Sequence, residues 1–160
     1  MKYIEVLTSI RQIIRSVNLE SKRIQKEYGI SIPQLLCLNY LSSQGNYQAS
    51  HTDIKNFLQL NASTVTGIIS RLEKKGLVAR LPKQQDRRIG LIVITAQGAN
   101  LLENIPEPLH EQLTTKLKQL PPEKLQKLQE SFDVITDFLK IDHLDASPII
   151  TAGTDIQNQE

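Results

Sequence analysis

The sequence has few of the residues that support redox, metal or disulfide chemistry. It contains one cysteine, Cys37, no tryptophan and only 4% aromatic residues. A single cysteine excludes an internal disulfide bond. Because Cys37 lies in the apolar stretch LLCLNYL without a neighbouring cation, we expect a buried structural thiol rather than a redox sensor. The three histidines are far apart and none stands at metal-ligand spacing with Cys or Asp, so we expect no metal and no other cofactor.

Long apolar runs and catalytic signatures are absent as well. No segment approaches the ~18 consecutive apolar residues of a membrane span, and the N-terminal stretch MKYIEVLTSIRQIIRS has charges where a signal peptide needs an apolar core. The sequence shows no glycine-rich phosphate loop, no paired carboxylates at the end of a strand, and no Ser/His or Cys/His set. We therefore expect a soluble, cytoplasmic protein that has no membrane partner and is not an enzyme.

What the sequence does have is an uneven distribution of positive charge. The 160 residues are 39% hydrophobic and 22% charged, an ordinary composition for a globular domain, and the formal net charge is only +2. Residues 71–88 carry seven basic and two acidic residues, a net +5, so the rest of the chain sums to −3. The seven are Arg71, Lys74, Lys75, Arg80, Lys83, Arg87 and Arg88. Such a segment is typical of a surface that binds an anionic polymer, although a solvated helix end followed by a charged turn has the same composition.

Apolar periodicity and helix breakers predict a mainly α protein with a small β-hairpin. The predicted helices cover residues 3–28, 33–41, 51–60, 62–75, 96–105, 109–120 and 121–140, and the predicted strands cover 77–82 and 91–95. Residues 42–50, SSQGNYQAS, are predicted to form a loop, and 83–90 the hairpin loop. The chain is polar and aperiodic over 143–160, which predicts a flexible tail.

Individual residues mark the ends and the inward faces of these helices. The expected helix starts are Ser31 before Pro33, Ser50 with Asp53, and Thr95, and the expected stop is Gly76. Ile54, Phe57 and Leu58 are expected to face the core. We expect the tyrosines Tyr3, Tyr28, Tyr40 and Tyr47 to pack in the core, although they could border a ligand cavity. His51 could contact a phosphate, but we expect it simply at the surface.

The predicted helix over 62–75 has two contrasting faces. The core-facing stripe is formed by Val65, Ile68, Ile69 and Leu72. The opposite side is small and polar and carries Ser63, Thr66, Gly67, Ser70 and Lys74, with Arg71 on its flank. These six residues and Thr64 are the candidate DNA contacts of the helix. Small hydroxyl residues allow a close approach to base edges in a major groove, and Arg71 and Lys74 would reach phosphates. A merely solvated face would more often carry Glu, Lys and Gln, whereas Gly67 costs roughly 1 kcal/mol of helix propensity relative to Ala.

The stretch DRRIGLIVIT, residues 86–95, attaches a charged tip to an apolar strand. A hairpin that follows such a helix and has a basic loop would be a wing, anchored through Ile92 and Ile94. The candidate DNA contacts of the wing are Lys83, Arg87 and Arg88. They would reach the DNA backbone or a narrow minor groove, where negative potential attracts arginine.

Asp86 needs a separate explanation, because a carboxylate would repel phosphate. We expect it to accept hydrogen bonds from an arginine, such as Arg88 or Arg71, and thereby to fix the shape of the wing. The alternative is a simple turn-forming aspartate, which is common.

These features together resemble the MarR family of winged helix-turn-helix regulators. The family's wing pattern, Asp-x-Arg followed by apolar-x-apolar-Thr, is matched within Asp86–Thr95. Upstream, STVTGIISRLEKKGLVAR (63–80) resembles the family's recognition helix and first wing strand, and TAQG after the wing resembles the start of the next helix. The resemblance covers roughly residues 3–140.

The resemblance implies a homodimer that regulates transcription. Residues 1–30 and 100–142 would form a helical dimerisation region, and 31–99 a winged helix-turn-helix domain for double-stranded DNA. Unpaired, the long apolar stripes of the outer helices would leave a sizeable apolar surface exposed. A dimer would place two recognition helices in successive major grooves of a pseudo-palindromic site. Members of the family act as repressors or activators, and many release DNA when a small molecule, a metal or an oxidant acts. We expect a regulator with a possible small-molecule effector; repression is the mode we expect, and the sequence itself leaves activation open.

The sequence departs from the family at Gly67, where many relatives carry a longer side chain, often Arg. Either a specific base contact is missing here, or the helix approaches the DNA more closely. The alternative function is a winged-helix module used only for protein contacts, without specific DNA binding. The basic wing and the Ser/Thr face argue against it, and the salt dependence of binding would separate the two.

Overall fold

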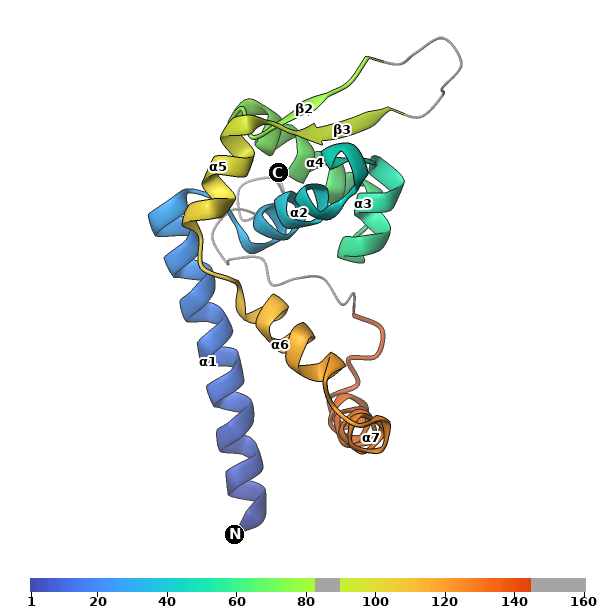
Figure 1. The fold of residues 1–160 in the computed structure, drawn as a ribbon. Coiled ribbons are helices and arrows are strands. Elements are labelled where there is room, and N and C mark those ends of the chain that lie inside the picture. Colours follow the sequence, from blue (N-terminus) through green and yellow to red (C-terminus); the bar gives the residue numbers. More distant parts are fainter. Residues whose placement is uncertain (83–89, 145–160) are drawn as a thin grey trace, which may run out of the picture. The chain divides into compact units, whose positions relative to one another are not determined.

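Figure 1 shows the computed structural model of the protein, which describes residues 1–82 and 90–144. The chain divides into two compact units, Met1–Pro106 and Glu107–Ala146. The predicted DNA-binding region, 31–99, falls within the first unit. The predicted dimerisation region contributes to both units, and its role stays a prediction. Residues 145–160 of the predicted tail lie outside the described part of the chain.

The first two helices lie where the sequence predicts, although α2 continues two residues into the predicted loop. α1 (Lys2–Tyr28) ends at Gly29, whose φ of 71° lies in the left-handed region that suits glycine. α2 (Ile32–Ser43) begins with a capping box, in which Ser31 Oγ accepts from the N–H of Gln34 and Gln34 Oε1 accepts from the N–H of Ser31. α2 is buried along most of its length, whereas α1 is buried only towards its C-terminal end.

α3 (His51–Leu58) and α4 (Ala62–Lys74) form the helix-turn-helix pair. The predicted cap of α3 is present: Ser50 Oγ accepts from the N–H of Asp53, and the Asp53 carboxylate accepts from the N–H of Ser50 at 3.3 Å. α4 stops just before Gly76, which has a φ of 74°. The predicted stop is therefore confirmed, and the chain turns there into the sheet.

A three-stranded antiparallel sheet, in the order β1-β3-β2, adjoins these helices (Figure 1). β2 (Val78–Arg80) and β3 (Leu91–Ile94) are the predicted strands of the hairpin. The prediction that 42–50 forms only a loop is wrong, because a 3₁₀ turn, η1 (Gly45–Tyr47), leads into β1 (Gln48–Ser50). β1 pairs with β3 far along the chain, and three residues are too short for a period-two pattern to show.

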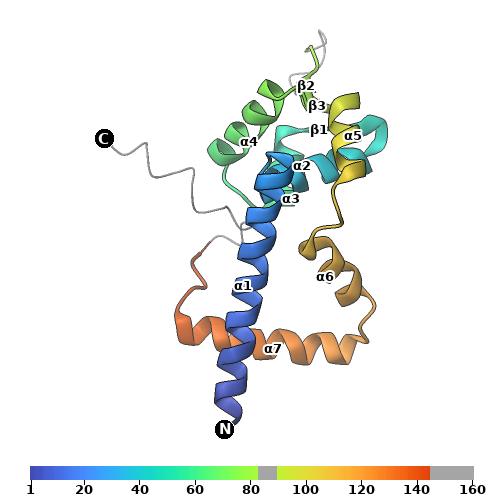
Figure 2. The same cartoon turned by 90° about the vertical axis from the view of Figure 1, so that its left-hand side faces the viewer.

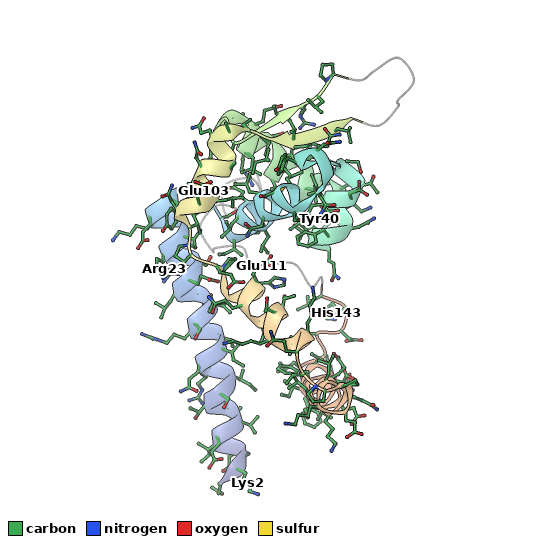
Figure 3. The ribbon with its side chains drawn as sticks, in the orientation of Figure 1. Lys2, Arg23, Tyr40, Glu103, Glu111 and His143 are labelled. Carbon is green, nitrogen blue, oxygen red and sulfur yellow. The ribbon has the colours of Figure 1, made fainter. Side chains whose placement is uncertain are left out.

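The core of the first unit lies between α2, α3, α4 and the sheet. Its largest fully buried side chains are Ile24, Ile30, Leu35, Leu36, Leu38, Leu41, Ile54, Ile69 and Leu72. Ile54 and Leu58 face inward as predicted, but Phe57 does not: it is 42% exposed and stacks on Tyr40, with ring centroids 4.4 Å apart. Figure 3 labels Tyr40 on α2. Phe57 lies at the edge of the apolar stripe of α3, where its ring meets Tyr40 instead of the core.

The tyrosines divide into two groups. Tyr28 and Tyr40 pack against the core as predicted, and the Tyr28 hydroxyl donates to the Asn104 carbonyl at 3.0 Å. The core prediction is wrong for Tyr3 and Tyr47, which are both mostly exposed. Tyr3 lies on the part of α1 that has no core beside it, and Tyr47 lies in the surface turn η1.

The remaining helices follow the predicted breaks. α5 (Ala96–Asn104) ends at Ile105, just before the prolines, and α6 (Leu109–Lys118) and α7 (Pro122–Leu139) form the second unit (Figure 2). No side chain of α6 or α7 is buried. The exposed apolar residues of the predicted α7 stripe are Leu125, Leu128, Phe132 and Leu139. None of the described helices has the length and apolarity required to cross a membrane.

Candidate nucleic-acid interface

The two faces of α4 separate as the sequence predicts. Val65, Ile68, Ile69 and Leu72 are buried in the core. On the other side, Ser63, Thr66, Arg71 and Lys74 are exposed, and Thr64, Gly67 and Ser70 are half-buried. The core stripe therefore orients the helix so that its small polar face looks outward. This outward face, which we call the α4 outer face, carries all seven candidate contacts of the helix.

Asn61 organises the N-terminal end of the α4 outer face. Its Oδ1 accepts from the backbone N–H of Thr64 and from the Ser63 hydroxyl, each at 2.8 Å. Asparagine is among the best N-cap residues because its side chain replaces a missing helix hydrogen bond. Asn61 is not among the helix starts predicted above, although an asparagine directly before a predicted helix is itself a start signal. The Ser63 proton is thereby committed to the cap.

His51 contacts the α4 outer face from the start of α3. Its Nε2 lies 3.0 Å from Thr66 Oγ1, and the same hydroxyl lies 2.9 Å from the Ala62 carbonyl, to which it can donate. His51 is half-buried rather than simply a surface residue. No local pattern indicates this contact, because 15 residues separate the two side chains.

Gly67 leaves the middle of the α4 outer face open. A methyl group placed on its Cα would meet nothing closer than Arg71 Nη1, at 3.9 Å. Beside it lies a pocket of about 260 Å³ lined by α1, α2 and α4, with the polar side chains of Gln25, Gln34, Thr64 and Arg71 among its walls. The pocket and the outer face thus share residues, so an occupant of the pocket would meet the surface predicted to contact DNA.

The basic residues near the end of α4 divide by their partners. Lys75 Nζ donates to the Gly29 carbonyl, and burial together with the nearby Arg71 charge lowers the pKa of Lys75. Arg80 forms an ion pair with Glu73 at 3.5 Å. Arg71 and Lys74 make no ion pair with the carboxylates that the structure describes, and both are exposed. These two cations therefore keep their charge available to an anion.

The wing is anchored as predicted at its base. Ile92 is buried, Ile94 packs against the core, and the N–H of Leu81 donates to the Leu91 carbonyl at 2.8 Å. The predicted wing contacts Lys83, Arg87 and Arg88, together with the structuring residue Asp86, lie outside the described residues. Their roles stay predictions.

Cys37 is a buried residue without a chemical role in the outer face. It is fully buried in α2, and burial raises the pKa of its thiol to about 12. The predicted burial is confirmed, and the raised pKa favours the protonated thiol, which is the less nucleophilic form. Within residues 1–82 and 90–144, no cluster of His, Cys, Asp and Glu could hold a metal ion.

Known proteins resemble this chain in sequence and in structure. The model of the MarR family matches residues 30–89. An uncharacterized HTH-type transcriptional regulator of Bacillus subtilis, YfiV, is 26% identical over 136 residues, which are 85% of this chain and 84% of the relative. Among solved structures, the S. aureus MepR–DNA complex has 25% identity and a TM-score of 0.59, and covers 83% of this chain and 95% of MepR.

A second solved structure contains a small molecule. NadR in complex with 4-hydroxyphenylacetate has 27% identity and a TM-score of 0.53, and covers 86% of this chain and 94% of NadR. The family match spans α2, α3, α4 and the start of the wing, which are the elements that build the outer face. Over residues 30–89 the chain therefore matches the MarR family, and the relatives that it resembles are named as HTH-type transcriptional regulators.

Proposed function

We propose that the protein is a homodimeric repressor that binds a pseudo-palindromic operator, with α4 of each protomer in a major groove. The observation that carries the proposal is the α4 outer face, which presents hydroxyl groups, a glycine and exposed cations. The buried stripe on the opposite side of the helix fixes the direction in which this face points. Small groups permit base contacts, and Arg71 and Lys74 supply charge for phosphates. The MepR–DNA complex supports this docking by similarity.

We infer the dimer from the apolar surface that a single chain leaves exposed. α7 exposes Leu125, Leu128, Phe132 and Leu139, and α1 likewise exposes Ile4, Leu7 and Ile14. Monomeric soluble proteins rarely expose contiguous apolar patches of this kind. Residues 1–30 and 100–142 are accordingly assigned to dimerisation, and 31–99 to DNA binding. A repressor of this type would act in the cytoplasm. Its dimer would occupy a promoter and thereby block the binding of other proteins there.

We further propose that a small molecule modulates DNA binding. The NadR complex shows that a relative binds an aromatic carboxylate, and this supports a comparable effector here without identifying it. A screen of aromatic carboxylates for release of bound DNA tests this part. Displacement that saturates at a defined ligand concentration supports an effector, and the absence of any displacement argues against this class.

The central test is the salt dependence of DNA binding. Fluorescence anisotropy with a labelled upstream fragment, at several salt concentrations, should give a steep fall in affinity, and Arg71→Ala, Lys74→Ala and Arg88→Ala should each lower the logarithmic salt slope by about 1. Lys127→Ala removes the same charge from α7 and serves as the matched control. Equal slopes for Arg71→Ala and Lys127→Ala would contradict the placement of α4 on DNA.

A further inference from the structure

The contact between His51 and Thr66 joins the two helices of the helix-turn-helix at the surface proposed to face DNA. His51 is the first residue of α3, and Thr66 lies in the second turn of α4. His51 Nε2 and Thr66 Oγ1 are 3.0 Å apart, and Thr66 Oγ1 and the Ala62 carbonyl are 2.9 Å apart. Thr66 is an exposed residue of the α4 outer face, and its hydroxyl contacts both intramolecular partners.

The hydroxyl of Thr66 has one proton and two neighbours that compete for it. If His51 carries its proton on Nε2, the imidazole donates to Thr66 and Thr66 donates to Ala62. If His51 carries its proton on Nδ1, Nε2 is an acceptor and Thr66 donates to it instead. The proton of Thr66 is committed within the protein in both tautomers. At least one oxygen lone pair remains for an outside partner.

A hydroxyl in this condition can accept a hydrogen bond from DNA but cannot donate one. In the major groove, adenine N6 and cytosine N4 are amino donors, whereas guanine O6 and thymine O4 are acceptors. An ordinary serine or threonine serves either class because its hydroxyl rotates. Thr66 held by His51 can pair only with the amino class.

The imidazole is needed for this restriction. A helical threonine that bonds only to the carbonyl four residues earlier holds its proton weakly, because that bond is easily exchanged for another acceptor. When Nε2 is the acceptor, the Thr66 proton lies on the bond to His51, and rotation of the hydroxyl towards DNA breaks that bond without providing a better one. His51 thereby converts an adaptable hydroxyl into a selective one.

We propose that His51 is a specificity-determining residue, which makes Thr66 an acceptor-only contact and so selects an adenine or cytosine amino group at the base that Thr66 faces. The inference rests on the proposed function, since it assumes that α4 lies in a major groove. It concerns which sequence is chosen rather than how tightly DNA is held. Transitions in the DNA, A to G or C to T, exchange an amino group for a carbonyl at the same groove position and are therefore the appropriate probe.

The test begins with a duplex that the wild-type protein selects from a random library. Every base pair of that duplex is then replaced by its transition, and affinities are measured for wild type, Thr66→Val, His51→Ala and His51→Gln, with His110→Ala as the matched histidine control. We expect one position per half-site at which the transition costs wild type about tenfold, which is typical of a lost base contact. Thr66→Val should abolish that penalty.

His51→Ala should reduce the penalty at this position to about twofold, because the released hydroxyl can then donate to the carbonyl. His51→Gln, which keeps an amide donor and acceptor, should retain most of it, and His110→Ala all of it. The inference is overturned if His51→Ala keeps the tenfold penalty, or if it weakens every duplex by one common factor, as loss of a phosphate contact or of folding would. A wild-type protein that selects no sequence overturns the proposed function at the first step, and this inference with it.

Discussion

The hydroxyl of Thr95 donates a hydrogen bond of 2.6 Å to the carbonyl of Gly76 and accepts one of 3.1 Å from the N–H of Gly98. Thr95 therefore joins the end of α4, the end of β3 and the start of α5. Its backbone N–H also donates to the Leu77 carbonyl at 3.1 Å. These bonds link the C-terminal end of α4 to the base of the hairpin.

Replacement of Thr95 by Ala is expected to destabilise the protein by about 1–2 kcal/mol, because it removes both a helix cap and a cross-link. Thr95→Ser keeps the hydroxyl and should lose much less. Urea denaturation followed by circular dichroism measures both. If the two variants were equally unstable, packing of the methyl group rather than the hydroxyl would be responsible.

Two helical glycines should respond to alanine in opposite directions. At Gly98, a new Cβ would lie 2.3 Å from the Leu77 carbonyl oxygen and 2.8 Å from Ile94 Cγ1, so Gly98→Ala should cost about 2 kcal/mol or more. At Gly67 there is room, and Gly67→Ala should stabilise the fold by up to about 1 kcal/mol through helix propensity. Thermal unfolding of the pair provides the comparison. A destabilised Gly67→Ala would mean that the open space at this position is needed by the fold itself.

Cys37 should make stability fall in alkaline solution. Burial raises the pKa of its thiol to about 12, whereas an unfolded thiol titrates near 8.5–9. Between those values the unfolded chain has lost the proton and the folded chain keeps it, so rising pH favours unfolding. Below about pH 8.5 both states hold the proton and the effect vanishes.

The expected contribution of Cys37 is up to about 1.4 kcal/mol per pH unit in that window. Urea titrations of wild type and Cys37→Ala between pH 7 and pH 11 measure it, since other titrating groups are common to both proteins. The wild-type free energy of unfolding should fall more steeply above pH 9. Parallel curves would show that the thiol is not protected from ionisation.

A charge placed on the α7 stripe should disrupt the proposed dimer. Phe132 is 47% exposed in one chain, and an aspartate there would be buried against a partner without a counter-charge. Phe132→Asp is expected to shift the protein towards monomer and to weaken operator binding at least about tenfold, because each half-site would then bind singly. Sedimentation velocity gives the oligomeric state. Gln126→Asp, off the stripe on the same helix, should remain dimeric.

Local patterns predicted most helix ends and the division of α4 into two faces. Ser31, Ser50 and Thr95 cap helices as expected because a cap needs only a side chain and the next three residues. The core stripe of α4 followed from apolar spacing for the same reason. The charge excess over 71–88 also pointed to an anionic partner, but Lys75 and Arg80 turned out to be held by Gly29 and Glu73.

The features that the sequence did not reveal are contacts between distant segments. β1 forms because it pairs with β3, and no residue pattern within Gln48–Ser50 predicts that pairing. Phe57 turns outward onto Tyr40 because the core beside α3 is already filled by Ile54 and Leu58. An apolar residue at a plausible helical position can therefore still lie at the surface.

By itself, the sequence determined most of the helices, their caps and the two faces of α4, because periodicity, caps and breakers act within a few residues. Only the tertiary structure decided which polar groups are already engaged, since that depends on neighbours brought together by folding. Thr66 illustrates the difference. The apolar spacing of Val65, Ile68 and Ile69 predicts that Thr66 lies on the α4 outer face. The contact of Thr66 with His51, which lies on another helix, is visible only in the folded structure. Because a hydroxyl has a single proton, that contact limits what Thr66 can still donate.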